Sequence, residues 1–196
     1  MGKQTVSSGK KQQFQQPQKS KRPLFIGAFV IIAAIVFVVV FLKPPAEVAA
    51  NYFGDPVATP RSYVGRAVSV TAVEPTIEDG KIKIPFSDVD KYSNIFFEVE
   101  NSEGTLVPMM AYITPSGRLF VGSSMCEPCR GRTFTLADDK LVCDTCRTTY
   151  TIEDHQFLTG AVACGQYPPV YMSPVIEDGM IVISHEEVLN WRIRAQ

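Results

Sequence analysis

The sequence predicts a small, mostly β domain carried on a single N-terminal transmembrane helix. Three observations predict this class: one long apolar run near the N-terminus, short alternating apolar segments over most of the remaining chain, and two Cys-x-x-Cys pairs that are expected to form paired knuckles. A short helix is expected at the C-terminus. The 196 residues suffice for an anchor and one ordinary domain of about 100–150 residues.

Residues 1–22 are polar and basic, and we expect a disordered cytoplasmic tail because almost no apolar side chain is available for burial. Residues 1–43 carry seven Lys or Arg and no Asp or Glu. Residues 44–196 therefore hold 12 of the 19 basic residues and all 20 acidic ones, a net charge of −8. This acidic balance argues against nucleic acid as a partner, because nucleic acid favours a basic face.

Residues 23–43 are predicted to be a transmembrane anchor. The run from Leu24 to Leu42 is apolar throughout, and its nineteen residues approach the roughly 30 Å of a bilayer core at about 1.5 Å each. The basic flank is expected to stay on the cytoplasmic side of the cell membrane, so that the chain beyond Lys43 lies outside. The alternative is a cleaved signal peptide, and the length of the run favours a retained anchor.

Residues 44–66 are rich in proline and glycine and are predicted to be a linker to an extracytoplasmic domain over residues 67–196. The β pattern begins where Val68, Val70 and Ala72 alternate with polar residues. Further strands are expected at 81–84, 94–100, 106–113 and 118–121.

A passage near the start of the domain is repeated near its end. Residues 74–84 and 173–183 both contain Ile-Glu-Asp-Gly followed by an alternating strand. Asp-Gly favours a tight hairpin turn, so two hairpins in equivalent places are expected, although one pair of motifs does not prove duplication. After the second hairpin, residues 184–187 have capping-box spacing and predict a helix through Trp191, with His185 structural or solvated rather than a ligand.

The sequence Cys126-Glu-Pro-Cys129 is followed after thirteen residues by Cys143-Asp-Thr-Cys146. Each pair is expected at a tight turn, so the four thiolates can reach the corners of a tetrahedron, which zinc, iron and iron–sulfur clusters all accept. The two halves are similar, since each is a cysteine turn that leads into a β-rich segment with an aromatic residue. Gly131 can adopt positive φ and is expected to fold the backbone back towards a sulfur.

Three interpretations of these cysteines stay open: a redox-active iron centre, a structural zinc site, and disulfides, which an extracytoplasmic location favours. Thiol–disulfide exchange is disfavoured because both pairs precede β segments rather than a helix. Cys164 is interpreted as a buried apolar residue, with a fifth ligand or a gatekeeper near the site as the alternatives. Met109 and Met110 are expected in the core, and Met125 is the methionine that adjoins a cysteine.

Several motifs together resemble the FtrD-like membrane iron–sulfur domain of bacterial and archaeal membrane proteins linked to iron uptake. In chain order they are Ile-Pro-Phe-Ser at 84–87, Phe-Phe-Glu-Val at 96–99, Ser-Gly-Arg at 116–118, the two Cys-x-x-Cys pairs, and a Gly-Ala run before a single cysteine. The resemblance covers residues 67–190. It implies a metal centre held by the four paired cysteines, beside an iron permease or an electron-transfer partner. The family has Gly-Gly-Cys-Asn-Pro around its later cysteine, whereas this sequence has Val-Ala-Cys164-Gly-Gln, which leaves the role of Cys164 open.

The cysteine loops are also loosely similar to Rieske cluster loops and to rubredoxin-type knuckles. Cys129 and Cys146 stand where Rieske domains have histidine. A cluster bound by four thiolates would have a lower potential than a two-histidine site, because each thiolate adds negative charge. Arg130 and Arg147 are expected to offset part of that charge.

The sequence favours a membrane-anchored electron carrier associated with iron transport, with an iron–sulfur cluster as its cofactor. Mononuclear iron and zinc are the alternative cofactors, and a zinc-stabilised interaction module or a metallochaperone is the alternative function. No catalytic residues are predicted, because the sequence has no Ser-His-Asp arrangement, phosphate-binding glycine loop or evident carboxylate pair. The oligomeric state and the identity of the permease or redox partner stay open.

Overall fold

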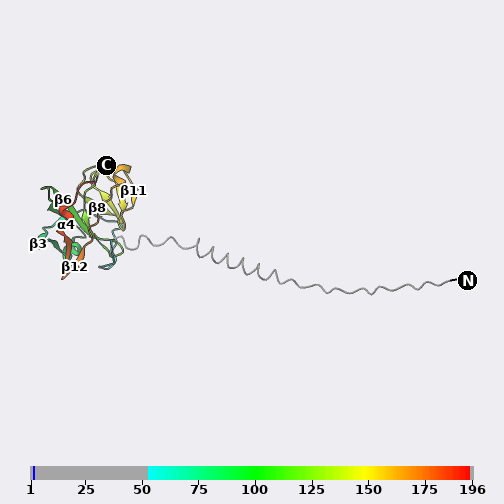
Figure 1. The fold of residues 1–196 in the computed structure, drawn as a ribbon, viewed down its shortest axis with the longest axis horizontal. Coiled ribbons are helices and arrows are strands. Elements are labelled where there is room, and N and C mark those ends of the chain that lie inside the picture. The colour runs from blue at the N-terminus through cyan, green and yellow to red at the C-terminus, as the bar shows by residue number, and fades with distance from the viewer. Residues whose placement is uncertain (1, 3–52, 195–196) are drawn as a thin grey trace. The chain divides into compact units, whose positions relative to one another are not determined.

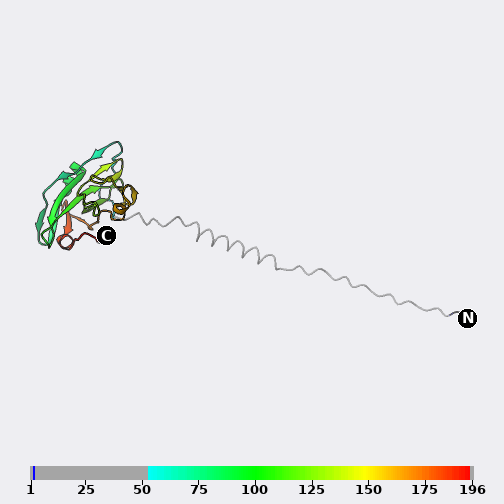
Figure 2. The same ribbon diagram turned by 90° about the horizontal axis from the view of Figure 1, so that it is seen from above.

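The computed structural model describes Gly2 and residues 53–194 (Figures 1 and 2). The chain divides into two compact units, Met1–Glu47 and Val48–Gln196, and the account below concerns the second. Among the described residues, no helix has the length and apolar character needed to cross a membrane. The predicted tail at 1–22 and anchor at 23–43 lie outside the described residues, apart from Gly2.

The described chain is mostly β, as predicted, and its strands form three sheets. The cysteine sheet has the order β1-β8-β9-β10-β11, the central sheet β2-β5-β6-β7, and the hairpin sheet β12-β13-β4-β3. The elements are β1 (Ala67–Val68), β2 (Thr71–Ala72), β3 (Thr76–Glu78), β4 (Lys81–Pro85), α2 (Phe86–Tyr92), β5 (Asn94–Glu100), β6 (Leu106–Ile113), β7 (Leu119–Ser123), β8 (Phe134–Ala137), β9 (Lys140–Cys143), β10 (Thr149–Thr151), β11 (Phe157–Thr159), α3 (Val162–Gly165), β12 (Val175–Glu177), β13 (Met180–Ser184) and α4 (His185–Leu189).

Strand β6 separates two apolar cores, because successive side chains of a strand point to opposite faces. Met109 and Ala111 pack into the first core with residues of the hairpin sheet. Met110 and Tyr112 pack into the second core with residues of the cysteine sheet. Figure 1 shows β3, β12 and α4 towards one side of the domain and β8 and β11 towards the other. One face of the central sheet therefore packs against the cysteine sheet. The prediction that Met109 and Met110 lie in the core is confirmed.

The two repeated passages form two hairpins in one sheet, as predicted. Both Asp-Gly turns have positive φ at both residues, 50° and 71° in the first and 49° and 75° in the second. Strand β4 pairs with β13 so that Lys83 lies opposite Val182, and these residues occupy the same position in the two copies. The hydrogen bonds from Phe86 N to Gly179 O (2.9 Å) and from His185 N to Gly80 O (3.0 Å) are equivalent. The two copies are thus related by an approximate twofold axis through the sheet.

The C-terminal helix forms, but the predicted capping box does not. Ser184 is the N-cap of α4 and makes no side-chain cap hydrogen bond, and the helix ends at Leu189 rather than Trp191. The carbonyl of Gly80 accepts the first backbone N–H of the helix, so one of the bonds that a cap usually supplies comes from the other hairpin.

Two further expectations differ from the structure. The alternating run from 67 to 72 is split, because β1 pairs with β8 of the cysteine sheet and β2 pairs with β5 of the central sheet. The described part of the expected linker packs on the domain, with Phe53 and Tyr63 buried and the Tyr63 hydroxyl donating to Ile113 O at 2.6 Å. Proline and glycine prevent regular structure there, but they do not prevent aromatic side chains from packing.

Candidate metal centre

The two cysteine knuckles have the same backbone structure. Cys126 N donates to Gly131 O at 2.8 Å, and Cys143 N donates to Thr148 O at 2.9 Å, so each loop closes over the same number of residues. The residue after the second cysteine of each loop has positive φ, 60° at Arg130 and 61° at Arg147. The expectation that Gly131 supplies the positive φ is therefore wrong. An arginine, Arg130 in the first knuckle and Arg147 in the second, reverses the chain instead.

Gly131 serves the site in another way. Its N–H donates to Cys129 Sγ at 3.4 Å, so the backbone folds back towards a sulfur as expected. A Cβ atom at this position would lie 2.9 Å from Cys143 Sγ and 2.9 Å from Thr145 Oγ1, closer than real Cβ contacts allow. The absence of a side chain lets the first knuckle lie directly against the second.

The structure brings the sulfurs of Cys126, Cys129, Cys143 and Cys146 together. The Cys126–Cys146 and Cys129–Cys143 Sγ–Sγ distances are both 3.8 Å, and all four sulfurs lie within 4.8 Å of one another. The five cysteines of the chain are free, and a 3.8 Å separation is far longer than the roughly 2.05 Å of a disulfide bond. The four cysteines are therefore thiols that could bind a metal ion, and they do not form disulfides in this structure.

Burial divides the four cysteines into two inner and two outer ones. Cys126 and Cys143 are fully buried, while Cys129 and Cys146 are half-buried. Cys146 Sγ lies 3.2 Å from Thr148 Oγ1, and the same hydroxyl accepts a hydrogen bond from Ala161 N at 3.2 Å. Thr148 thus joins the outer edge of the site to the segment before α3.

Hydrogen bonds and burial shift the pKa values of these thiols in different directions. The Cys126 thiol donates to Cys143, which together with backbone N–H groups lowers the pKa of Cys143 to about 5 despite its burial. The same interaction with Cys143 raises the pKa of Cys126, and burial raises it further. Burial raises the pKa of Cys129 to about 12. At neutral pH the metal-free site therefore holds a thiolate at Cys143 and protonated thiols at Cys126 and Cys129.

Metal affinity is expected to rise with pH because binding must displace the protons of Cys126 and Cys129. These two protons alone correspond to an increase of at least about 100-fold in apparent affinity per pH unit near neutrality. The increase should become steeper below pH about 5, where Cys143 is also protonated. The slope of apparent affinity against pH is measured by competition titrations of the metal-free protein with Co²⁺ and a chelator at pH of about 6.5 and about 7.5. An apparent affinity that does not change with pH would contradict this proton count.

The side chain between the first two cysteines is held by the C-terminal end of the domain. Glu127 is 1% exposed, and its carboxylate accepts hydrogen bonds from Arg194 N at 2.7 Å and Arg194 Nε at 2.8 Å. The Arg194 guanidinium also donates to Pro168 O at 2.8 Å and lies over the ring of Tyr167. Sequence reasoning missed both residues, because they are 67 positions apart and neither belongs to a motif.

Replacing Glu127 with glutamine is expected to lower the free energy of unfolding by about 1–3 kcal/mol, because Arg194 loses its charged partner. The first knuckle should also release metal to a chelator faster. Glu103→Gln is the matched control, since Glu103 pairs with Arg192 at 2.7 Å on the surface and such pairs contribute at most about 1 kcal/mol. Equal effects of the two substitutions on metal release would refute a positioning role for Glu127.

The structure does not bring Cys164 into the group of four. Cys164 is buried in α3 and belongs to the same apolar core as Cys126 and Cys143. Its backbone carbonyl accepts a hydrogen bond from the Tyr150 hydroxyl at 2.6 Å. This placement agrees with the interpretation of Cys164 as a buried apolar residue and gives no support to a fifth ligand.

Other candidate residues lie apart from the sulfurs. Met125 packs in the core on the opposite side of the central sheet. His155 is buried with its Nε2 2.6 Å from the Tyr112 hydroxyl, and burial lowers its pKa to about 3, so it is a neutral core residue. His185 is the first residue of α4 and is not part of the cysteine group.

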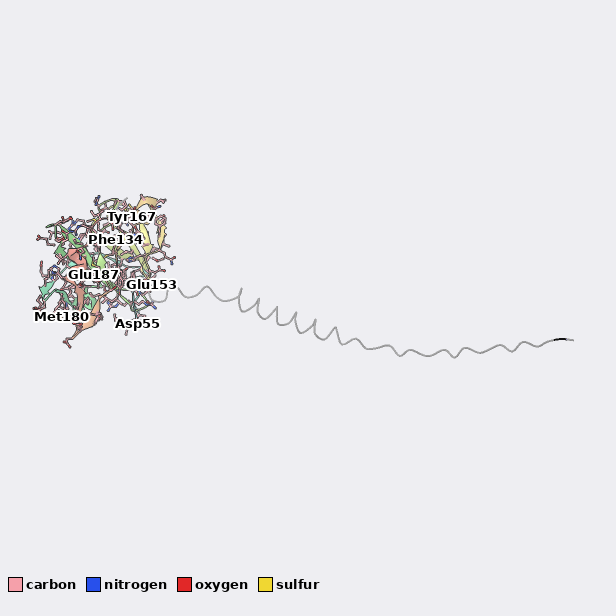
Figure 3. The ribbon with its side chains drawn as sticks, in the orientation of Figure 1. Asp55, Phe134, Glu153, Tyr167, Met180 and Glu187 are labelled. Carbon is pink, nitrogen blue, oxygen red and sulfur yellow. The ribbon has the colours of Figure 1, made fainter. Side chains whose placement is uncertain are left out.

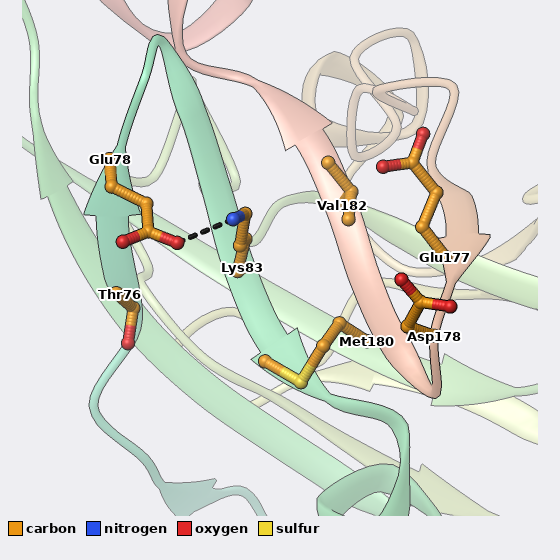
Figure 4. Close-up of a pocket in the computed structure, with 7 residues that line it drawn as sticks. All are labelled: Thr76, Glu78, Lys83, Glu177, Asp178, Met180 and Val182. Carbon is orange, nitrogen blue, oxygen red and sulfur yellow. Dashed lines mark hydrogen bonds and ion pairs between the residues drawn. The ribbon is translucent and has the colours of Figure 1, made fainter.

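A shallow pocket of 360 Å³ lies on the outer face of the hairpin sheet (Figure 4). The residues that line it are Thr76, Glu78, Lys83, Glu177, Asp178, Met180 and Val182. Glu78 and Lys83 form an ion pair across it at 2.5 Å. In Figure 3, Met180 lies below and to the left of Phe134, which begins the strand after the first knuckle. No cysteine lines the pocket, so it is separate from the metal centre.

Comparison with known proteins agrees with this geometry. A family model described as "Membrane iron-sulfur containing protein FtrD-like" matches residues 89–194, just over half of the chain, and this range contains all five cysteines. No curated protein and no solved structure matches the sequence. The match begins after the first hairpin, which the resemblance in sequence had included. The chain therefore belongs to the FtrD-like family of membrane iron–sulfur containing proteins and carries a four-cysteine metal site.

Proposed function

We propose that this domain is a one-electron carrier that holds iron at Cys126, Cys129, Cys143 and Cys146. Residues 23–43 anchor it in the cell membrane with the domain on the extracytoplasmic side, where it serves iron transport through a permease or redox partner. The observation that carries this proposal is the convergence of four sulfurs within 4.8 Å in a chain whose family is described as iron–sulfur containing.

The donor set suits iron, because four thiolates are the ligands that iron takes in iron–sulfur proteins. Iron held in this way supplies a one-electron couple when bound. Cys126 and Cys143 hold the inner side of the site in the apolar core and exclude water from it. Cys129 and Cys146 are half-buried, so the outer side is the one from which an electron reaches a partner.

Arg130 and Arg147 lie exposed at the two equivalent knuckle tips. Their positive charges stand beside a set of four thiolates and reduce its net negative charge. Within the described residues, no histidine or carboxylate belongs to the sulfur group. This composition suits electron transfer, which needs no proton-moving side chain, better than acid–base catalysis.

The test is a redox titration of the full-length protein, purified without oxygen in detergent. We expect bound iron and a reversible one-electron couple that Cys146→Ser abolishes. Cys164→Ser should leave the couple in place, because Cys164 lies outside the group. Iron-loaded protein without a reversible couple would refute the proposal.

A zinc-stabilised interaction module is the second candidate. A closed set of four protein ligands is the usual form of a structural zinc site, and two of these cysteines are fully buried. Protein that contains zinc when isolated from cells supplied with ample iron, and that has no redox couple, would favour this second function.

A further inference from the structure

We infer that the four cysteines hold a single metal ion and not a cluster of several irons bridged by sulfide. This inference rests on the proposed function, because it concerns the cofactor of the same site. It starts from the spacing of the four sulfurs and from the strands that set this spacing.

The spacing of the sulfurs matches one tetrahedral ion. A metal–sulfur bond of about 2.3 Å places tetrahedral ligands about 3.8 Å apart, since the edge of a tetrahedron is about 1.6 times its centre-to-corner length. The Cys126–Cys146 and Cys129–Cys143 distances are both 3.8 Å. Every other pair lies within 4.8 Å, so a small contraction brings all four sulfurs to one ion.

The same spacing is too short for a sulfide-bridged cluster. In a two-iron cluster each iron takes two thiolates, and the iron–iron vector adds to the outward bonds, so thiolates on different irons lie roughly 5–7 Å apart. In a four-iron cluster every thiolate is on its own iron, and all separations are roughly 6 Å. The close contacts of Cys126 with Cys146 and of Cys129 with Cys143 could each share one iron, but the two pairs are then too near each other for two irons.

The cysteine sheet holds the two knuckles at this distance. The first knuckle leads into β8, the second knuckle begins at the end of β9, and these strands pair with Phe134 opposite Cys143. Asp144 N also donates to Thr133 O at 3.1 Å. Moving the knuckles apart to admit more irons would break these hydrogen bonds.

Close packing between the knuckles opposes the insertion of bridging sulfide. The backbone at Gly131 lies so close to the second knuckle that a single added carbon would be 2.9 Å from Cys143 Sγ. Phe134 and Tyr150 are buried in the same apolar core as Cys126 and Cys143. A lone iron bound by four cysteine sulfurs still suits a family described as iron–sulfur containing, because the cysteines themselves supply the sulfur.

A single-ion site should load without sulfide. We would add Fe²⁺ alone, and separately Co²⁺ alone, to metal-free full-length protein under anaerobic conditions in detergent, and measure metal and acid-labile sulfide per chain. We expect one metal per chain, no stoichiometric sulfide, and the visible absorption of tetrahedral cobalt with four thiolate ligands. Cys164→Ser should keep this cobalt spectrum, and Cys146→Ser should change it.

Protein isolated anaerobically from cells decides the native state of the site. Two or four irons with matching sulfide in that protein would overturn the inference while leaving the electron carrier intact. One iron without sulfide would support the inference. One zinc without sulfide, and without a redox couple, would also support the single-ion site but would refute the electron carrier, so the two proposals fail separately.

Discussion

Replacing Cys143 with serine is expected to lower the metal affinity of the protein by at least about 100-fold, which is more than the loss typical of a group that only supports a ligand. Cys143 is fully buried, and its lowered pKa makes it a thiolate at neutral pH before a metal arrives. At saturating metal, a 100-fold loss removes about 2.7 kcal/mol of the stabilisation that binding gives the fold. Chelator competition and metal-dependent thermal unfolding measure the two effects.

The matched control for this substitution is Cys164→Ser. Both thiols are buried in the same apolar core, so the two changes place a similar hydroxyl in a similar environment. Only Cys143 belongs to the group of four sulfurs. We therefore expect Cys164→Ser to cost stability without loss of metal affinity. If both variants lost affinity equally, the assignment of Cys143 as a ligand would be wrong.

Substitution of Gly131 by alanine is expected to reduce metal affinity by about 10–100-fold, although Gly131 contributes no side chain to the site. The added methyl group would lie 2.9 Å from Cys143 Sγ and from Thr145 Oγ1, so the two knuckles must move apart. That movement lengthens the Cys129–Cys143 contact of 3.8 Å and weakens the bond from Gly131 N to Cys129 Sγ. The cobalt absorption spectrum and chelator competition report both changes.

Gly80→Ala separates crowding at the site from general backbone strain. Gly80 has a φ of 71° with no atom within 4 Å of an added Cβ, and it lies in the turn between β3 and β4 of the hairpin sheet. Alanine there is expected to cost about 1 kcal/mol of unfolding free energy through strain alone. Metal affinity should stay unchanged in this variant. A normal cobalt spectrum in Gly131→Ala would show that the knuckles are not in direct contact.

Local sequence patterns predicted the strands well where alternation is strong. The expected strands 94–100 and 106–113 coincide with β5 and β6, and the Asp-Gly turns form as expected. These features depend on neighbouring residues, because strand periodicity and turn geometry are set within a few positions. The alternating run from 67 to 72 was less informative, since its two halves pair in different sheets and no local signal marks the crossing.

The sequence by itself determined the composition of the metal site. Two cysteines three positions apart are expected at one turn, and two such turns can supply the four thiolates that one metal site needs. The likeness between the two loops, and the family to which the chain belongs, were also visible in the sequence, because both depend on the order of residues alone.

Only the tertiary structure decided the distance between the two knuckles. The pairing of Phe134 with Cys143 and the close approach at Gly131 hold the knuckles at the 3.8 Å sulfur contacts, on which the inference of a single ion rests. The tie between Glu127 and Arg194 joins residues 67 positions apart and has no sequence signature. The spacing between ligands depends on strand register and packing across the whole domain, and these long-range contacts complete the site that local spacing begins.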